Sequence, residues 1–145
     1  MDWRLLVGRL ISPRKDWIEE VMYRWRKFHR YRKHICDCSN MSAYFYKLFT
    51  EDFRIASTLR LCVGEYSVYI CCSPKHAFLC FDFHPDDKVG RDKTITRYYD
   101  PVFAADITRF VNRVKPWKPI EFVGDLETAK EIYGEFEFSE GDCDV

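Results

Sequence analysis

Two apolar segments with a period of two residues constrain the fold of this chain most strongly. In residues 76–83 (HAFLCFDF) an apolar side chain stands at every second position from Ala77 to Phe83, which is the spacing of one face of a β-strand. Residues 94–101 (TITRYYDP) form a similar segment, and Pro, Asp and Gly mark the intervening residues 84–93 as an exposed loop. The sequence therefore predicts an antiparallel hairpin.

Apolar residues recur at helical spacing in other segments, both before and after this hairpin. Ser12-Pro13 precedes one apolar stripe, and Asp37 or Ser39 can cap the start of a second, largely buried helix. Alternating Phe136 and Phe138 could add an edge strand near the C-terminus. Helices are predicted at about 13–33, 38–50, 103–114 and 126–134, and further strands at 59–63, 65–72 and 120–124.

The order of these elements, helices before a run of strands, favours the α+β class with N-terminal helices packed on an antiparallel sheet. The chain has 145 residues, 47% of them hydrophobic, so we expect a single domain over 1–145. No apolar run approaches the roughly 20 residues of a membrane-spanning helix, and the N-terminus lacks the pattern of a secretory leader. We therefore expect a cytoplasmic protein that makes no membrane contact.

Charge is distributed unevenly, although 23 basic residues balance 23 acidic ones. Residues 1–34 contain ten basic and four acidic residues, a net charge of +6, and include the basic N-terminal helix at 13–33. The acidic C-terminal segment, 121–145, contains one basic and nine acidic residues, a net charge of −8. The equal totals of basic and acidic residues exclude a uniformly basic nucleic-acid binder. We expect the acidic segment to fold back against the basic helix or to compete with its partner.

The seven cysteines do not suggest a disulfide framework. Their number is odd, and the spacings of Cys36/Cys38 and Cys71/Cys72 are too tight for ordinary bridges within each pair. Reduced thiols in a cytosol fit better. These spacings also differ from those of structural zinc knuckles, and no Gly-x-Gly phosphate loop occurs. The sequence predicts no metal site and no cofactor.

Three residues combine into a candidate catalytic site. Cys38 stands at the start of a predicted helix, where the helix dipole and backbone N–H groups favour a thiolate and can hold an oxyanion. His76 begins one strand of the predicted hairpin and Asp100 ends the other, so antiparallel pairing brings them together. In this interpretation Cys38 attacks a carbonyl, His76 carries the proton, and Asp100 orients the imidazole.

These residues resemble the transglutaminase-like cysteine peptidases of the papain-like superfamily. DCSNMSAYFYKL is similar to the nucleophile helix of that family, KHAFLCF to its His-starting strand, and YYDPVF to its closing Asp-Pro segment. The resemblance covers about 35–103 and implies a papain/transglutaminase-like core of the compact bacterial, phage or archaeal type. It also implies a thiol hydrolase or acyltransferase acting on a peptide or amide substrate, which we expect to be a protein. Ser39 and Met41 depart from the family pattern at non-catalytic positions.

A donor for the oxyanion is less clearly defined. Papain-like enzymes often use a Gln side chain upstream of the cysteine, and this chain contains no Gln. The Cys38 backbone N–H is one donor, and Trp25, Tyr31 or His34 could supply the second. Loss of one such donor slows acyl transfer by about 10²–10³-fold.

For this reason a catalytically silent interaction module of the same fold remains the alternative. Its basic N-terminal helix would bind an acidic protein or nucleic acid, and nucleic acid is the less favoured partner because most aromatics there fall on the apolar stripe with Trp17 and Phe28. The oligomeric state is left open. The candidate anion-binding residues are Arg24, Arg26, Lys27, Arg30 and Lys33.

Overall fold

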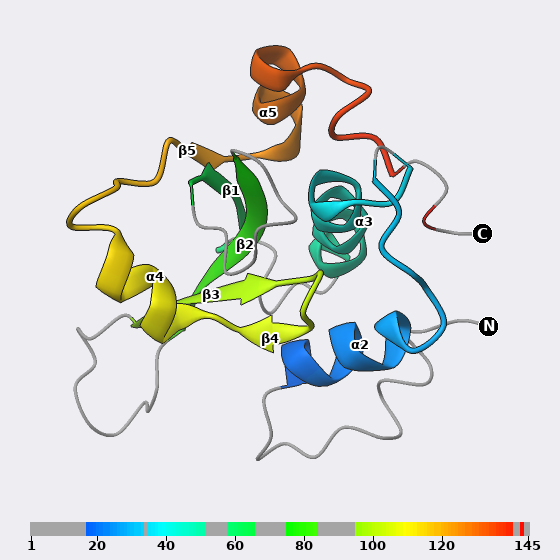
Figure 1. The fold of residues 1–145 in the computed structure, drawn as a ribbon, viewed down its shortest axis with the longest axis horizontal. Helices are drawn as coiled ribbons and strands as arrows, with labels where there is room; N and C mark the ends of the chain where they lie inside the picture. The colour runs from blue at the N-terminus through cyan, green and yellow to red at the C-terminus, as the bar shows by residue number, and fades with distance from the viewer. Residues whose placement is uncertain are drawn as a thin grey trace.

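A five-stranded antiparallel sheet forms the centre of the fold (Figure 1). The computed structural model describes residues 17–33, 35–51, 58–65, 75–83 and 95–140, together with Cys143. The strand order is β4-β3-β2-β1-β5, and every neighbouring pair is antiparallel. The strands are β1 (Arg60–Gly64), β2 (His76–Phe83), β3 (Ile95–Asp100), β4 (Ala105–Asp106) and β5 (Phe122–Gly124).

Helices cover both faces of this sheet. Three of them, α2, α3 and α5, pack on one face, and α4 packs on the other (Figure 1). This arrangement confirms the predicted α+β class with an antiparallel sheet. The helices of the described residues are α2 (Trp17–Arg26), α3 (Cys38–Thr50), α4 (Thr108–Val114) and α5 (Leu126–Tyr133).

Strand alternation divides the core into two clusters. On the α3 side, Leu79 and Phe81 of β2 pack with Tyr99 of β3, and on the α4 side Phe78 and Cys80 pack with Val111. Complete burial of a large apolar side chain is worth about 1.5–3 kcal/mol, so both helix–sheet interfaces hold β2 in place. The β2 side chains are mostly apolar on both faces of the sheet, because helices cover both faces.

The first helix is shorter than predicted, ending at Arg26 rather than near residue 33. Two side chains form hydrogen bonds with backbone carbonyls that would accept backbone N–H groups in a further helical turn. The His29 ring bonds the Trp25 carbonyl at 2.7 Å, and the Arg26 guanidinium donates to the His29 carbonyl. Phe28, which the apolar stripe placed in the core, is 73% exposed beyond the helix end. Residues 13–16 lie outside the described part of the chain.

The predicted helix at 103–114 begins only at Thr108, because a turn and a short strand precede it. Asp106 ends β4 and accepts the Thr108 N–H at 2.8 Å, which starts α4. Ala104, at φ 52°, lies in the turn that reverses the chain from β3 into β4.

Of the remaining elements, the predictions of β5 and α5 are confirmed, whereas the edge strand predicted around Phe136 and Phe138 is wrong. Residues there form turns. The strand predicted at 65–72 falls outside the described residues except for Glu65.

Candidate functional site

Cys38 is the first residue of α3, as the sequence predicts. Asp37 caps this helix: its carboxylate accepts the Asn40 N–H at 3.3 Å and the Ser39 hydroxyl at 2.9 Å, and the Asn40 side chain accepts the Asp37 N–H at 3.2 Å. This reciprocal capping box fixes the first turn of the helix. The Cys38 side chain is half-buried and forms no disulfide. A thiol is thus held at the positive end of a thirteen-residue helix.

His76 and Asp100 form a buried pair. The register of the β2–β3 hairpin sets Leu79 opposite Tyr99, so the first residue of β2 and the last residue of β3 lie at the same end of the sheet. His76 Nε2 lies 2.7 Å from Asp100 Oδ2, and the two side chains are 1% and 0% exposed. A carboxylate accepts hydrogen bonds and does not donate them, so the tautomer that fits this contact carries its hydrogen on Nε2.

Asp100 is held by one further hydrogen bond, whose donor residue is itself fixed by Arg26. Its second oxygen, Oδ1, accepts the Val102 N–H at 2.9 Å. The Val102 carbonyl in turn accepts a bond of 2.9 Å from Arg26 Nε, which ties the end of α2 to the residues after β3. Burial lowers the pKa of the Arg26 guanidinium, and attraction to Asp100 opposes that shift. The carboxylate is therefore oriented from both sides.

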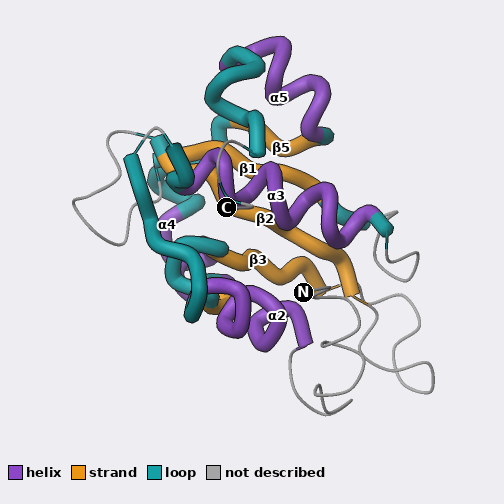
Figure 2. Tube along the Cα trace, turned by 90° about the vertical axis from the view of Figure 1, so that its right-hand side faces the viewer, coloured by secondary structure: helices purple, strands orange, loops and turns teal. Residues whose placement is uncertain are grey.

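The start of α3 and the start of β2 lie at the same end of the molecule. The two elements lie side by side (Figure 2), and near the C-terminal end of each the Phe49 and Phe81 rings meet at 5.8 Å. Eleven residues of helix separate Cys38 from Phe49, about 16 Å, and five residues of strand separate His76 from Phe81, also about 16 Å.

The His76 and Cys38 side chains do not share one face of the sheet. Alternation groups His76 with Phe78, whose ring is 6.2 Å from the imidazole, on the α4 side, whereas Cys38 packs against the α3-side cluster. The His76 imidazole and the Cys38 side chain therefore lie toward opposite faces of the sheet. The structure thus brings His76 and Asp100 into direct contact and sets Cys38 at the same end of the fold.

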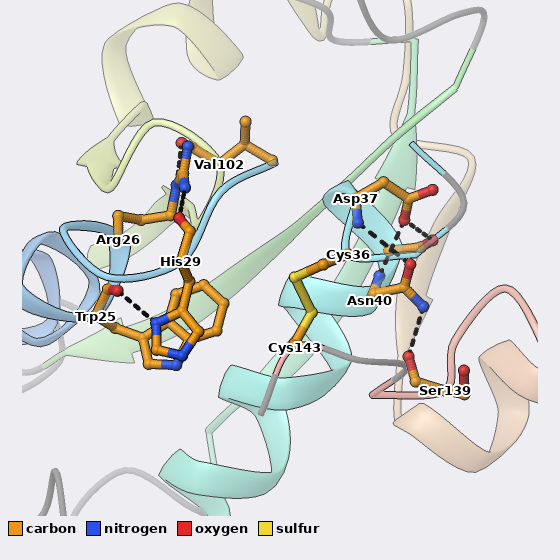
Figure 3. The surroundings of a disulfide bond; sticks show 10 residues. Trp25, Arg26, His29, Cys36, Asp37, Asn40, Val102, Ser139 and Cys143 are labelled. Atoms are coloured by element: carbon orange, nitrogen blue, oxygen red, sulfur yellow. Dashed lines mark hydrogen bonds between the residues drawn. A yellow bond between two sulfur atoms is a disulfide. The ribbon is translucent and has the colours of Figure 1, made fainter. Parts of the chain in front are cut away.

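A disulfide joins Cys36 to Cys143 across 107 residues, with the two Cα atoms 5.2 Å apart (Figure 3). The expectation that all thiols are reduced is therefore wrong for Cys36, which is 1% exposed. An odd cysteine count excludes complete pairing but still allows one bridge, and cysteine pairing cannot be deduced from sequence alone. Cytoplasmic location stays a prediction.

Other contacts bind the same C-terminal segment to α3. We call residues 134–140 with Cys143 the C-terminal strap. The Ser139 carbonyl accepts a bond of 2.7 Å from Asn40 Nδ2 (Figure 3), and Glu140 pairs with Lys47 at 2.9 Å. The strap thus holds residues on both sides of Cys38. Of the acidic segment, Glu140 contacts α3 through Lys47, whereas Glu121 pairs with Lys75 before β2 and Glu127 with Lys130 within α5.

The three oxyanion candidates lie in different places. Trp25 is fully buried, and its indole N–H has no hydrogen-bond acceptor among the described residues. Its ring packs on Tyr44 at 5.0 Å, six residues and about 9 Å along the helix axis from Cys38. Tyr31 is half-buried in contact with the α3-side core, and His34 lies outside the described residues. The structure does not bring Trp25 directly beside Cys38.

The five candidate anion-binding residues do not form one helix face. Arg24 pairs with Glu20 at 2.8 Å, and Arg26 is directed inward to Val102. The Lys27 ammonium lies over the Tyr23 ring at 4.7 Å, beyond the end of α2. The other two candidates, Arg30 and Lys33, are exposed in the non-helical segment.

The remaining described cysteines, Cys62 and Cys80, lie in the α4-side core. Burial raises the pKa of the Cys62 thiol well above its ordinary value, so this thiol is unsuited to nucleophilic chemistry. Across the ranges given above, no cluster of three or more His, Cys, Asp or Glu side chains is arranged to hold a metal ion.

No protein-family model, curated protein or solved structure matches this chain. Within the described residues, no helix combines the length and apolar character that crossing a membrane requires. The chemistry of the site must therefore be argued from its own geometry.

Proposed function

We propose that this chain is a cysteine-dependent enzyme that hydrolyses or transfers the acyl group of a peptide or amide through a thioester on Cys38. One observation carries the proposal: a buried His76–Asp100 pair at the end of the sheet where the Cys38 helix begins. The order of helix start, strand start and strand end also supports a papain/transglutaminase-like core, the finer fold class that the sequence motifs resemble.

Burial of the pair argues for a chemical role. Moving an ionisable pair out of water costs several kcal/mol, and well-packed apolar residues of similar volume often replace such pairs with no loss of stability. His76 and Asp100 are nevertheless in the core, with the Val102 N–H directed at the second carboxylate oxygen. A fixed imidazole tautomer is useful to a general base, and it adds little to stability.

The proposed reaction moves one proton in each direction. The Cys38 thiol must first move to His76 Nδ1, to which it is not hydrogen-bonded in this structure. Nδ1 then takes the thiol proton as Sγ attacks the carbonyl carbon, which gives a tetrahedral oxyanion. When the C–N bond breaks, His76 returns that proton to the leaving amine and a thioester remains on Cys38. Water or a second amine, deprotonated by His76, then attacks the thioester and restores the thiol. Asp100 stabilises the imidazolium throughout.

The N-terminal end of α3 supplies the first oxyanion donor in this scheme. Helix N-termini present backbone N–H groups that no intrahelical carbonyl accepts, and the capping box engages those of Asp37 and Asn40. We assign the Cys38 N–H to the oxyanion. The proposal assigns no second donor, because the Trp25 ring is buried against Tyr44, about 9 Å along the helix axis from Cys38.

An activated ester tests the proposal without knowledge of the substrate. The native, oxidised protein is mixed with p-nitrophenyl acetate, and we expect a burst of about one nitrophenolate per chain with the acetyl group on Cys38 by peptide mass spectrometry. His76→Gln retains a hydrogen-bond donor toward Asp100 but cannot carry the proton. We expect that variant to slow the burst by about 10²-fold or more.

Cys38→Ser and Cys62→Ser form a matched pair of controls. The first should remove the burst and the second should leave it unchanged, with both variants folded by circular dichroism. Acetylation spread over several side chains, or a burst that survives in folded His76→Gln, would refute the proposed enzyme.

A further inference from the structure

The turn after α4 exposes an aromatic side chain among cations. Trp117 is 85% exposed, more than any other large hydrophobic residue of the described chain. Residues 107–120 (ITRFVNRVKPWKPI) contain four basic residues and no acidic one. A bulky indole left in water beside concentrated positive charge marks a surface for an anionic partner with flat apolar faces.

Helix geometry directs two of the cations outward. Arg109 and Arg113 are four residues apart and share one face of α4, whereas Val111, half a turn away, is fully buried against the sheet. Both arginines are exposed, and neither has an acidic partner in the described part of the chain. Their spacing along the helix axis is about 6 Å.

The turn that carries Trp117 is fixed before any partner arrives. The Val114 carbonyl accepts the N–H groups of both Trp117 and Lys118, at 2.9 and 3.0 Å, and prolines flank the segment at 116 and 119. Lys115 lies over the Tyr98 ring at 5.8 Å, and Lys118 meets Glu65 at 3.4 Å in an ion pair whose members are both more than half exposed. Such an exposed pair is weak and exchanges readily, and a rigid turn loses little entropy on binding.

We propose that this basic α4 surface, formed by Arg109, Arg113, Lys115, Trp117 and Lys118, binds single-stranded nucleic acid. The cations hold the phosphates, and one base stacks on the Trp117 ring. Aromatic stacking within a positively charged track is how proteins bind single strands without reading their sequence.

Two features favour a single strand over other anionic partners. Trp117 is the only exposed large hydrophobic residue of 107–120, too small an apolar area for anchoring in a lipid surface. An acidic polypeptide would satisfy the cations but has no planar group at each charge, whereas every nucleotide brings a base with its phosphate.

The basic α4 surface shares no residue with the proposed catalytic site, although α4 covers the face of the sheet on which His76 lies. Helix α3, which begins with Cys38, covers the other face (Figure 1). The proposal therefore goes beyond the proposed function and does not depend on it. It also differs from the sequence-based alternative, which assigned anion binding to the N-terminal helix.

Fluorescence anisotropy of a labelled oligothymidylate of twelve nucleotides, titrated with the full oxidised chain at several KCl concentrations, tests the proposal. Four cations give an expected slope of log K against log salt between about −2 and −3. Arg109→Glu/Arg113→Glu should weaken binding by at least tenfold and flatten the slope. Lys27→Glu/Arg30→Glu makes the same charge change on the exposed segment after α2 and should alter binding by less than about threefold.

Stacking is tested separately from charge. Trp117→Ala should weaken binding by about 5- to 150-fold, the loss of one base–aromatic stack, and Trp117→Tyr should restore most of it. The proposal fails if the oligonucleotide does not bind at low salt or if Trp117→Ala binds as wild type does. It also fails if Lys27→Glu/Arg30→Glu causes the larger loss, or if polyglutamate of equal length binds as tightly as the oligonucleotide.

Discussion

Removal of the Cys36–Cys143 disulfide should destabilise the fold strongly, because this bond closes most of the chain into one loop. The perturbation is Cys143→Ser. In the unfolded state the bond restrains two residues that are 107 positions apart. The chain-entropy relation gives about 4.7 kcal/mol for a loop of 100 residues, and measured values are commonly lower.

The noncovalent contacts of the strap survive the substitution. Phe138 is 2% exposed, and the Asn40–Ser139 bond remains. We therefore expect a loss of about 3–4.5 kcal/mol in the free energy of unfolding. With a typical urea m-value of about 2 kcal/mol per molar, the unfolding midpoint should fall by about 1.5–2.3 M.

Urea denaturation followed by circular dichroism, with and without a phosphine reductant, provides the assay. Reductant should lower the midpoint of the wild type to that of Cys143→Ser and leave the variant unchanged. A difference below about 1 kcal/mol, or an equal effect of reductant on both proteins, would refute the account of the strap.

Three further predictions concern local contacts. Asp37→Ala, which removes the α3 cap, should cost about 1–2 kcal/mol of unfolding free energy in urea, and a cost below about 0.3 would contradict the capping box. Phe81→Ala, in the α3-side core, should lower the free energy of unfolding by about 3–5 kcal/mol. Phe136 is 71% exposed, so Phe136→Ala should lower it by less than about 0.5 kcal/mol. Equal losses in the two variants would contradict the burial of Phe81. Burial, and the bond to Glu121, raise the pKa of Tyr133 to about 12; Glu121→Gln should lower this pKa in a tyrosine absorbance titration, and an unchanged midpoint would contradict the contact.

The β-hairpin could be predicted from sequence because its pattern is local. Alternation in 76–83 and a turn-rich loop defined two adjacent strands, and antiparallel pairing then required His76 and Asp100 to lie at one end. The start of α3 at Cys38 was equally local, since Asp37 is a preferred capping residue just before an apolar helical stripe. These parts of the candidate site follow from neighbours in the sequence.

Other features depended on contacts between distant residues. The end of α2 is set by the side chains of Arg26 and His29, and Arg26 is drawn toward Val102, 76 residues away. The partner of Cys36 lies 107 residues away, and no local pattern encodes that pairing. β4 contains two residues, too few for a periodic signal. The exposure of Trp117 depends on how α4 packs, with Val111 buried against the sheet, and the local sequence does not show that packing.

The rate at which Cys38 is alkylated tests the central claim, that the fold activates this thiol through His76. Iodoacetamide is applied near pH 6 to the oxidised protein, native and unfolded in urea, and modification of each cysteine is followed by peptide mass spectrometry. The account predicts that Cys38 reacts at least about tenfold faster in the native state than in urea, although folding half-buries it, and that His76→Gln removes this advantage. A native rate at or below the unfolded rate, or one that folded His76→Gln leaves unchanged, would contradict it.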